Sequence, residues 1–197
     1  TLTGNGDVGG VPGNAILTVG PLQVTGTAAF ALVLQTVDAD TDGNGTADLI
    51  GGTLLGLALD VSQAGVSIEN VATLTVSGRL GLALLKAADP LVDGRSWFAL
   101  KMGDVTVSGG LDPSLDIGLS ATITIGALDY HSASNSLNPT AVVKRLNWAR
   151  AFDLDGDGGF DDVLDPGAQL PVAQDLAIDF ASSLQLRLTG TLTGNGA

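Results

Sequence analysis

Two short stretches of the chain place oxygen-bearing side chains at every second position around a glycine. The first reads Asp-Thr-Asp-Gly-Asn-Gly-Thr-Ala-Asp over residues 40–48, and the second reads Asp-Leu-Asp-Gly-Asp-Gly-Gly-Phe-Asp over residues 153–161. A hard cation such as Ca²⁺ takes about six to eight oxygen ligands, and several carboxylates on a tightly curved backbone supply them. Both stretches are therefore predicted calcium loops.

Each loop offers side-chain oxygens and one backbone carbonyl at the spacing that such a site needs. The predicted ligands are Asp40, Asp42, Asn44, the carbonyl of Thr46 and Asp48 in the first loop, and Asp153, Asp155, Asp157, the carbonyl of Gly159 and Asp161 in the second. Asp38, Asp162 and Asp165 stand beside the loops, and the spacing leaves open whether they also bind metal. The alternative is a solvated turn, because Asp and Gly also favour turns for conformational reasons.

Neither loop has the Glu at its twelfth position that closes a regulatory EF-hand, because Gly51 and Leu164 stand there. Both loops resemble the shorter D-x-D-G-x-G-x-x-D loops of thrombospondin type 3 repeats, of dockerins and of many bacterial surface proteins. This resemblance implies that the chain binds about two Ca²⁺ ions and that they brace its structure.

The charge of the chain is strongly acidic and is concentrated in these loops. Asp and Glu number 21 against 8 Lys and Arg, and the net charge is −13. Four acidic residues lie within 38–48 and six within 153–165, and two bound Ca²⁺ would change the net charge from −13 to −9 (−13 + 4). A phosphate backbone would be repelled, so we expect no nucleic-acid partner. No apolar run is long enough for a membrane-spanning helix.

The sequence offers little material for catalysis. It contains no Cys and a single histidine, His131, which lies in a polar run and is expected to be an exposed loop residue. No phosphate-binding G-x-x-x-x-G-K-S/T motif is present. We therefore expect a protein that is not an enzyme.

Alternation of apolar and polar residues dominates the rest of the chain and predicts long amphipathic β-strands. Long alternating stretches lie at 22–34, 72–84, 115–125 and 184–192, and shorter ones lie at 16–19, 55–68, 98–107 and 172–180. The apolar side changes parity beside Gly65 and Gly103, which predicts β-bulges there. The predicted fold is all-β, with mostly antiparallel strands in a sandwich or rolled sheet whose apolar faces meet in one core.

Two longer insertions interrupt the strands, at 35–54 and 128–171, and each carries one calcium loop. One short helix is expected in the second insertion. Asn138 would cap it, Pro139 would open it, and it would end near Arg150.

The string Thr-Leu-Thr-Gly-Asn-Gly occurs at residues 1–6 and again at 191–196, a displacement of 190 positions. We interpret residues 1–197 as a single repeat unit, with period 190, of a tandem array whose neighbouring copies are its partners. An added tag at both ends is the alternative. The low aromatic content and the abundance of Gly, Ala, Leu, Thr and Val resemble those of giant bacterial surface proteins.

These observations predict a calcium-stabilised structural module of a large secreted or cell-surface protein, which acts as a spacer or scaffold in adhesion. An extracellular or bacterial cell-surface location follows from that resemblance. Two alternatives stay open: a surface-layer or filament subunit that self-assembles, and a lipid-binding β-groove. The adhesive target is not indicated by the sequence.

Overall fold

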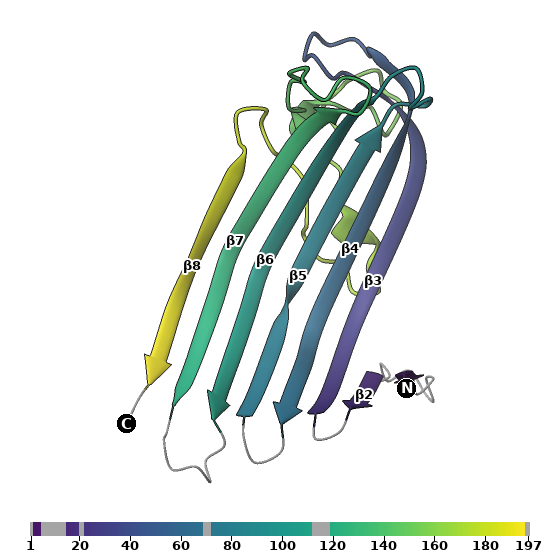
Figure 1. The fold of residues 1–197 in the computed structure, drawn as a ribbon. Helices are drawn as coiled ribbons and strands as arrows, with labels where there is room; N and C mark the ends of the chain where they lie inside the picture. Colours follow the sequence, from purple (N-terminus) through teal and green to yellow (C-terminus); the bar gives the residue numbers. More distant parts are fainter. Residues whose placement is uncertain (1, 5–14, 20–21, 69–71, 112–118, 196–197) are drawn as a thin grey trace.

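The computed structural model of the chain describes residues 2–4, 15–19, 22–68, 72–111 and 119–195. Eight strands form one antiparallel sheet in which each strand lies beside the next one along the chain (Figure 1). The strands are β1 (Leu2–Gly4), β2 (Ala15–Val19), β3 (Leu22–Ala39), β4 (Leu49–Ile68), β5 (Ala72–Lys86), β6 (Arg95–Leu111), β7 (Ser120–Asn135) and β8 (Leu186–Asn195). The predicted all-β, antiparallel class is confirmed. The described residues form a single sheet, so a sandwich or rolled sheet is not confirmed.

The alternating stretches of the sequence correspond to the strands of this sheet. The long stretches at 22–34 and 72–84 fall in β3 and β5. The stretch at 184–192 begins two residues before β8, and residues 120–125 of the stretch at 115–125 lie in β7. The shorter stretches at 16–19, 55–68 and 98–107 fall in β2, β4 and β6. The strands also extend into the two predicted insertions, since β3 runs to Ala39, β4 begins at Leu49 and β7 runs to Asn135.

The predicted bulges are present in β4 and β6. The β4–β5 register shifts between Val61 and Ala64, and the β5–β6 register shifts opposite Asp104, a non-glycine residue with a φ of 55°. Gly78 of β5 lies against the second bulge with a φ of +144°, and a Cβ atom there would lie 2.7 Å from the Cα of Val105. A glycine is therefore required where β5 and β6 approach at this bulge.

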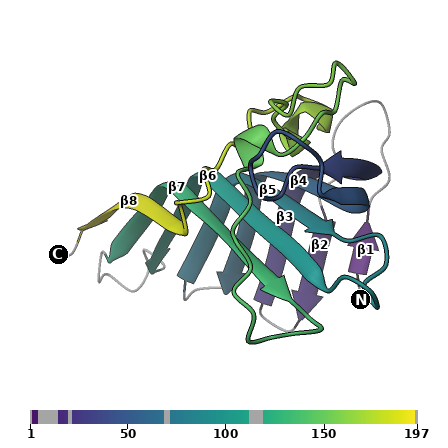
Figure 2. The same ribbon diagram turned by 90° about the horizontal axis from the view of Figure 1, so that it is seen from above.

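Residues 136–185 connect β7 to β8 and pack against one face of the sheet, over the part that is uppermost in Figure 1 (Figures 1 and 2). We call this stretch the covering segment. It contains two short 3₁₀ helices, η2 (Trp148–Arg150) and η3 (Pro166–Gln169). The main core lies between the covering segment and the sheet. Its members from the sheet include Leu54, Ala83, Leu85, Trp97 and Ala99, and its members from the covering segment include Leu146, Trp148, Phe152, Leu164, Ile178 and Phe180.

The helix expected from Asn138 to Arg150 is wrong. Only the three residues of η2 are helical in this range, and the chain before them runs irregularly over the sheet. The indole Nε1 of Trp97 donates a 3.0 Å hydrogen bond to the carbonyl of Lys144, a contact that an unbroken helix would compete for. In the described part of the chain, no helix is long and apolar enough to cross a membrane.

The stretch at 172–180 is also not a strand of the sheet. Its side chains do alternate, since Leu176, Ile178 and Phe180 are buried, but they pack as part of the covering segment. Its one β-type pairing is an isolated bridge between Ile178 and Leu164. The alternation predicted correctly which side chains are buried, but it did not predict that this stretch lies outside the sheet.

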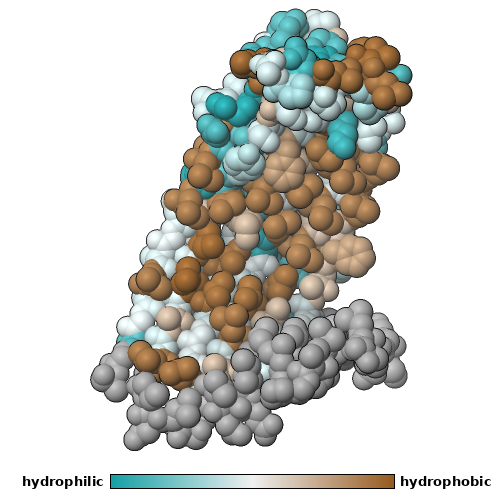
Figure 3. All heavy atoms as spheres, viewed as in Figure 1, coloured by the Kyte–Doolittle hydropathy of each residue, from teal (hydrophilic) through white to brown (hydrophobic). Residues whose placement is uncertain are grey.

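The other face of the sheet carries apolar side chains in cross-strand rows, and we call it the open face (Figure 3). The pairing of the strands defines three rows: Leu34, Leu55, Leu84, Phe98 and Ser132; Leu32, Leu57, Leu82, Leu100, Tyr130 and Leu186; and Phe30, Leu59, Leu80, Met102, Leu128 and Leu188. None of these residues is charged. Phe30, Leu32 and Leu34 expose 70%, 60% and 67% of their surface, so none of the residues that the structure describes covers this face.

Candidate metal sites

The first Asp-rich loop joins β3 to β4 at one end of the sheet, and the carboxylate of Asp40 organises it. Asp40 is buried, and it accepts hydrogen bonds from the backbone N–H groups of Gly43 and Gly45 at 2.7 Å and of Asn44 at 3.2 Å. Gly43 and Gly45 have φ angles of +81° and +84°, a left-handed conformation that glycine adopts without strain. The alternating glycines therefore let the backbone curl around one carboxylate.

Asp48 closes this loop. Its carboxylate accepts hydrogen bonds from the backbone N–H of Thr41 at 2.6 Å and from the Thr41 hydroxyl at 2.7 Å. Arg95, at the start of β6, donates to Asp48 at 2.9 Å and forms a second ion pair with Asp93 at 2.8 Å. Burial raises the pKa of Asp48, but the hydrogen bonds from Arg95 and Thr41 outweigh it and hold that pKa below the ordinary value. Asp48 is therefore ionised at neutral pH.

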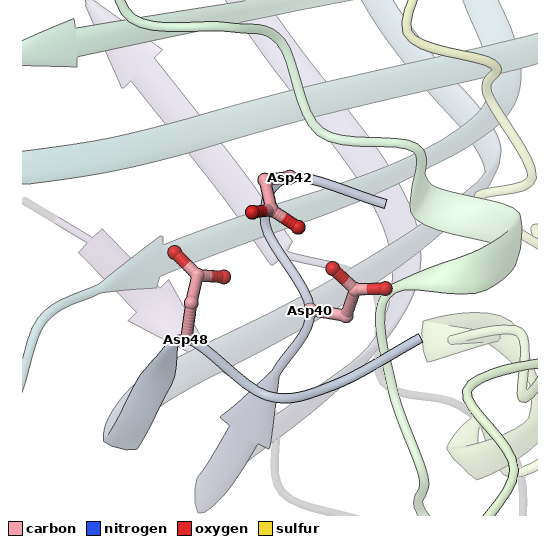
Figure 4. A group of neighbouring side chains, drawn as sticks. All are labelled: Asp40, Asp42 and Asp48. Atoms are coloured by element: carbon pink, nitrogen blue, oxygen red, sulfur yellow. The ribbon is translucent and has the colours of Figure 1, made fainter. Parts of the chain in front are cut away.

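Asp40, Asp42 and Asp48 point toward a common space at this end of the sheet (Figure 4). Each offers a carboxylate oxygen that lies within 4.8 Å of the others, a spacing that could hold a metal ion. Asn44 lies on the rim of the group, where its amide donates to Asp42 at 3.0 Å and its Oδ1 accepts from the Thr46 N–H at 2.8 Å.

The second loop repeats this construction within the covering segment. The carboxylate of Asp153 accepts from the backbone N–H groups of Gly156 at 2.8 Å and Gly158 at 3.0 Å, as Asp40 accepts from Gly43 and Gly45. Gly156 and Gly158 have φ angles of +81° and +91°. Two sequences that share only the Asp and Gly spacing thus adopt the same turn.

The closing carboxylate of the second loop comes from Asp162. It accepts from the N–H of Leu154 at 2.6 Å, which is the position that Thr41 takes relative to Asp48. The group of carboxylates within 4.8 Å of one another is accordingly Asp153, Asp155 and Asp162. The spacing of the first loop pointed instead to Asp161. The second loop has one more residue before its closing carboxylate, and the sequence alone does not show which of two adjacent Asp residues turns inward.

The remaining predicted ligands lie around this group. Asp157 accepts from the N–H of Gly159 at 2.7 Å. A Cβ atom on Gly159 would lie 3.0 Å from carboxylate oxygens of both Asp157 and Asp161, so the backbone is closely enclosed there. Asp165 serves a different purpose, because its Oδ1 accepts from the N–H groups of Gly167 and Leu176 and fixes the turn at η3.

The two loops lie side by side although about 105 residues separate them in sequence. Ala39 forms a β-bridge with Phe152, Phe152 forms another with Asp162, and the N–H of Asp40 donates to the carbonyl of Ala151 at 3.0 Å. A hollow of about 510 Å³ separates them, and it is lined by residues of both loops that include Asp40, Asn44, Gly158 and Asp161, and by Arg150. Spacing within the sequence gave no sign of this contact.

Two cations lie beside the first loop, where the sequence did not lead us to expect them. They are Arg95, described above, and Lys144, whose ammonium donates to the carbonyl of Asp42 at 2.7 Å. Both reach the loop from distant parts of the chain, so no local pattern identifies them. They offset part of the repulsion among the carboxylates.

The chemistry of both groups suits a hard cation. All their donors are oxygens, and each ionised carboxylate has two oxygens with several lone pairs. The hydrogen bonds to the turn amides therefore leave lone pairs that can face an ion. Two Asp groups that could hold a metal ion are thus present in the part of the chain that the structure describes.

His131 is not the exposed loop residue that the sequence suggested. It lies on β7, faces the covering segment and is fully buried. Its Nε2 contacts the carbonyl of Leu184, and its ring packs edge-on against Phe180 with 5.7 Å between the ring centres. Burial lowers the pKa of His131 below its ordinary value, so the ring is neutral at pH 7.

Comparison with known proteins finds no match, since no protein-family model, no curated protein and no solved structure matches the chain.

Proposed function

We propose that this chain is a calcium-stabilised structural module of a large secreted or cell-surface protein, and that it acts as a spacer or scaffold in adhesion. The observation that carries the proposal is the pair of carboxylate groups, Asp40, Asp42 and Asp48 in one and Asp153, Asp155 and Asp162 in the other, at the same end of the sheet. We infer that each group binds one Ca²⁺ ion and that the protein is not an enzyme.

Calcium is favoured over other metals by the donor set. The groups contain oxygen donors, and soft or borderline metals prefer the nitrogen and sulfur ligands of His and Cys. Mg²⁺ requires a near-ideal octahedron and gives up its water reluctantly, whereas Ca²⁺ accepts irregular shells of carboxylates and carbonyls. Asp-rich turns with three converging carboxylates offer such an irregular shell and therefore suit Ca²⁺.

Bound ions would stabilise the two Asp-rich loops and the contact between them. Each loop brings three carboxylates close together, and these repel one another unless a cation lies between them. Because the bridge between Ala39 and Phe152 connects the two loops and the bridge between Phe152 and Asp162 closes the second, an ion in either loop would also fix the covering segment to the end of β3. Calcium would then stabilise the packing of the core as well as the loop that binds it.

A tandem array is supported by the repeated string Thr-Leu-Thr-Gly-Asn-Gly. Its described residues lie in β1 and in β8, so both copies are extended and occupy opposite edges of the sheet. We propose that neighbouring copies of the unit are its partners and that the array serves at the outside of the cell.

Thermal unfolding in calcium, in magnesium and in a chelator tests this function. A site that binds only the folded chain contributes about 2.7 kcal/mol at a hundredfold excess of ion over its dissociation constant, which corresponds to a rise in Tm of roughly 5 to 11 °C. We expect calcium to raise the Tm by this amount or more, and magnesium to raise it less.

A double variant and a matched control separate binding from simple charge screening. Asp42→Asn with Asp155→Asn removes one carboxylate from each group, and Asp89→Asn with Asp175→Asn removes two carboxylates elsewhere. All four residues accept a hydrogen bond from the N–H two positions later, so the local turn chemistry is the same. The proposal requires the first variant to lose the calcium response and the second to keep it. Equal responses in the two variants would overturn it.

A further inference from the structure

The open face is the largest feature of the molecule that the proposed function leaves unused. One of its rows runs across six strands without a break, through Leu32, Leu57, Leu82, Leu100, Tyr130 and Leu186. Figure 3 shows the apolar side chains of this face as a continuous area over the strands. The apolar residues of the edge strand are exposed as well, since Leu186 and Leu188 of β8 expose 61% and 60% of their surface.

The bulges extend the apolar character of this face along the strands. Beyond them, Val76 lies opposite Val107, Val107 opposite Ile123, and Ile123 opposite Leu192, which forms a further cross-strand row. Each bulge changes the parity of its own strand, so the apolar residues stay on one side of the sheet where an unbroken strand would turn them to the other.

Charged residues in the middle of the sheet lie on the opposite face. Asp60 is paired in register with Arg79, and Asp129 is paired with both Lys101 and Arg187. The ammonium of Lys101 donates to the carbonyl of Ala177 in the covering segment, which shows the side to which this set points. In the middle of the sheet, the covered face is therefore charged and the open face is apolar.

The size of the open face decides what can cover it. Six strands at about 4.8 Å and the span from Leu74 to Leu84 at about 3.3 Å per residue give roughly 29 by 36 Å, or roughly 1,000 Å². The largest apolar patch on a typical monomer is about 300–600 Å². Two such faces in contact would bury roughly 2,000 Å², and a stable interface buries about 1,200–2,000 Å² in total.

We propose that the open face binds the open face of a second copy of this chain, so that two sheets form a sandwich across it. A face with apolar rows and no charge is complementary to itself, which a two-fold symmetric interface requires. Sheets pack face to face about 10 Å apart, with their strands within about 30° of one another. The sandwich expected from the sequence would then be completed between copies.

Charge favours this partner over a lipid surface and also sets its orientation. The chain carries a net charge of −13, so an anionic bilayer would repel it. Both Asp loops lie at one end of the sheet, and like charges repel least when the two copies place these ends at opposite ends of the sandwich. The two-fold axis therefore lies perpendicular to the strands. The interface does not depend on either Asp loop holding an ion.

Sedimentation velocity of the chain, in calcium and in a chelator, tests the interface. We expect a dimer at micromolar concentration in both solutions. Leu82→Lys places an ammonium at the centre of the open face, and we expect it to weaken dimerisation by more than about 100-fold, because the charge would be buried without a partner. The matched control is Leu91→Lys, which changes an apolar residue that is 86% exposed in the loop between β5 and β6 and should leave the dimer intact.

Several outcomes would overturn the interface. One is a parent chain that is monomeric, and another is a parent chain that binds neutral phosphatidylcholine vesicles as a monomer. A third is a Leu82→Lys variant that keeps the far-ultraviolet circular dichroism of the parent chain and dimerises as strongly. A calcium response of the Tm in a chain that stays monomeric would reject the interface and keep the proposed function. A dimer with no calcium response would do the reverse.

Discussion

Asp40 offers the sharpest separation between a carboxylate that only shapes a turn and one that also binds an ion. In the absence of calcium, Asp40→Ala removes the acceptor for the N–H groups of Gly43, Asn44 and Gly45, two of them bonded at 2.7 Å. A hydrogen bond to a charged group contributes about 1.5 to 3 kcal/mol, and the freed amides lie in an exposed turn where water replaces part of that. We expect a loss of about 2 to 4 kcal/mol, or a fall in Tm of roughly 4 to 16 °C.

Calcium should enlarge this loss. The parent chain gains about 2.7 kcal/mol from the first site at a hundredfold excess of ion over the dissociation constant, and the variant lacks that gain. Urea denaturation followed by circular dichroism, in calcium and in a chelator, measures both losses. Asp89→Ala is the control, since Asp89 accepts one turn hydrogen bond from Leu91 and belongs to neither carboxylate group. If Asp40→Ala costs the same in both solutions, Asp40 shapes the turn and does not bind calcium.

Three further predictions concern the sheet and the core. Because the folded pKa of His131 lies below its unfolded value of about 6.5, the unfolded chain takes up the proton first, and urea titrations should show the parent losing stability relative to His131→Gln as pH falls from about 6.5 toward the folded pKa. Gly78→Ala should lower the free energy of unfolding in urea by about 2 kcal/mol or more, since its Cβ would lie 2.7 Å from the Cα of Val105 in a strained conformation. Arg187→Met should cost about 1 to 3 kcal/mol in the same assay, because Asp129, whose side chain is 1% exposed, loses the half-exposed guanidinium that bonds it, and Asp129→Leu in the same chain should recover most of the loss.

The strands could be predicted because their information is local. Alternation along one strand states which side chains share a face, and the parity changes at Gly65 and Gly103 located the bulges before any pairing was known. Alternation does not state what covers each face. A second sheet was therefore expected to cover the apolar face of the strands, whereas no described residue covers the open face in this structure.

The errors in the covering segment have a common cause. Val142 and Leu146 have helical spacing, yet Val142 is 99% exposed and Leu146 is fully buried, because contacts with the sheet decide the path of this stretch. His131 stands in a polar run, and it is buried because Phe180 and Leu184 of a distant stretch lie over it. Local composition cannot represent either contact.

Spacing predicted where the two Asp-rich turns form, but not which carboxylates come together in the second turn. Both turns form around the expected first carboxylate, Asp40 or Asp153, because Asp and Gly specify such a turn on their own. The inward carboxylate of the second group, Asp162, depends on how the chain returns to Phe152, and the contact between the two loops depends on the whole fold.

Titration of calcium into the chelator-treated chain by isothermal calorimetry tests the central claim most directly. The account predicts saturable binding of about two ions per chain, one for each carboxylate group. Asp155→Ala should leave about one ion, and the Asp89→Asn, Asp175→Asn chain should still bind both. If circular dichroism shows that the chain is folded and no calcium binds at millimolar concentration, the claim that these loops are metal sites is contradicted.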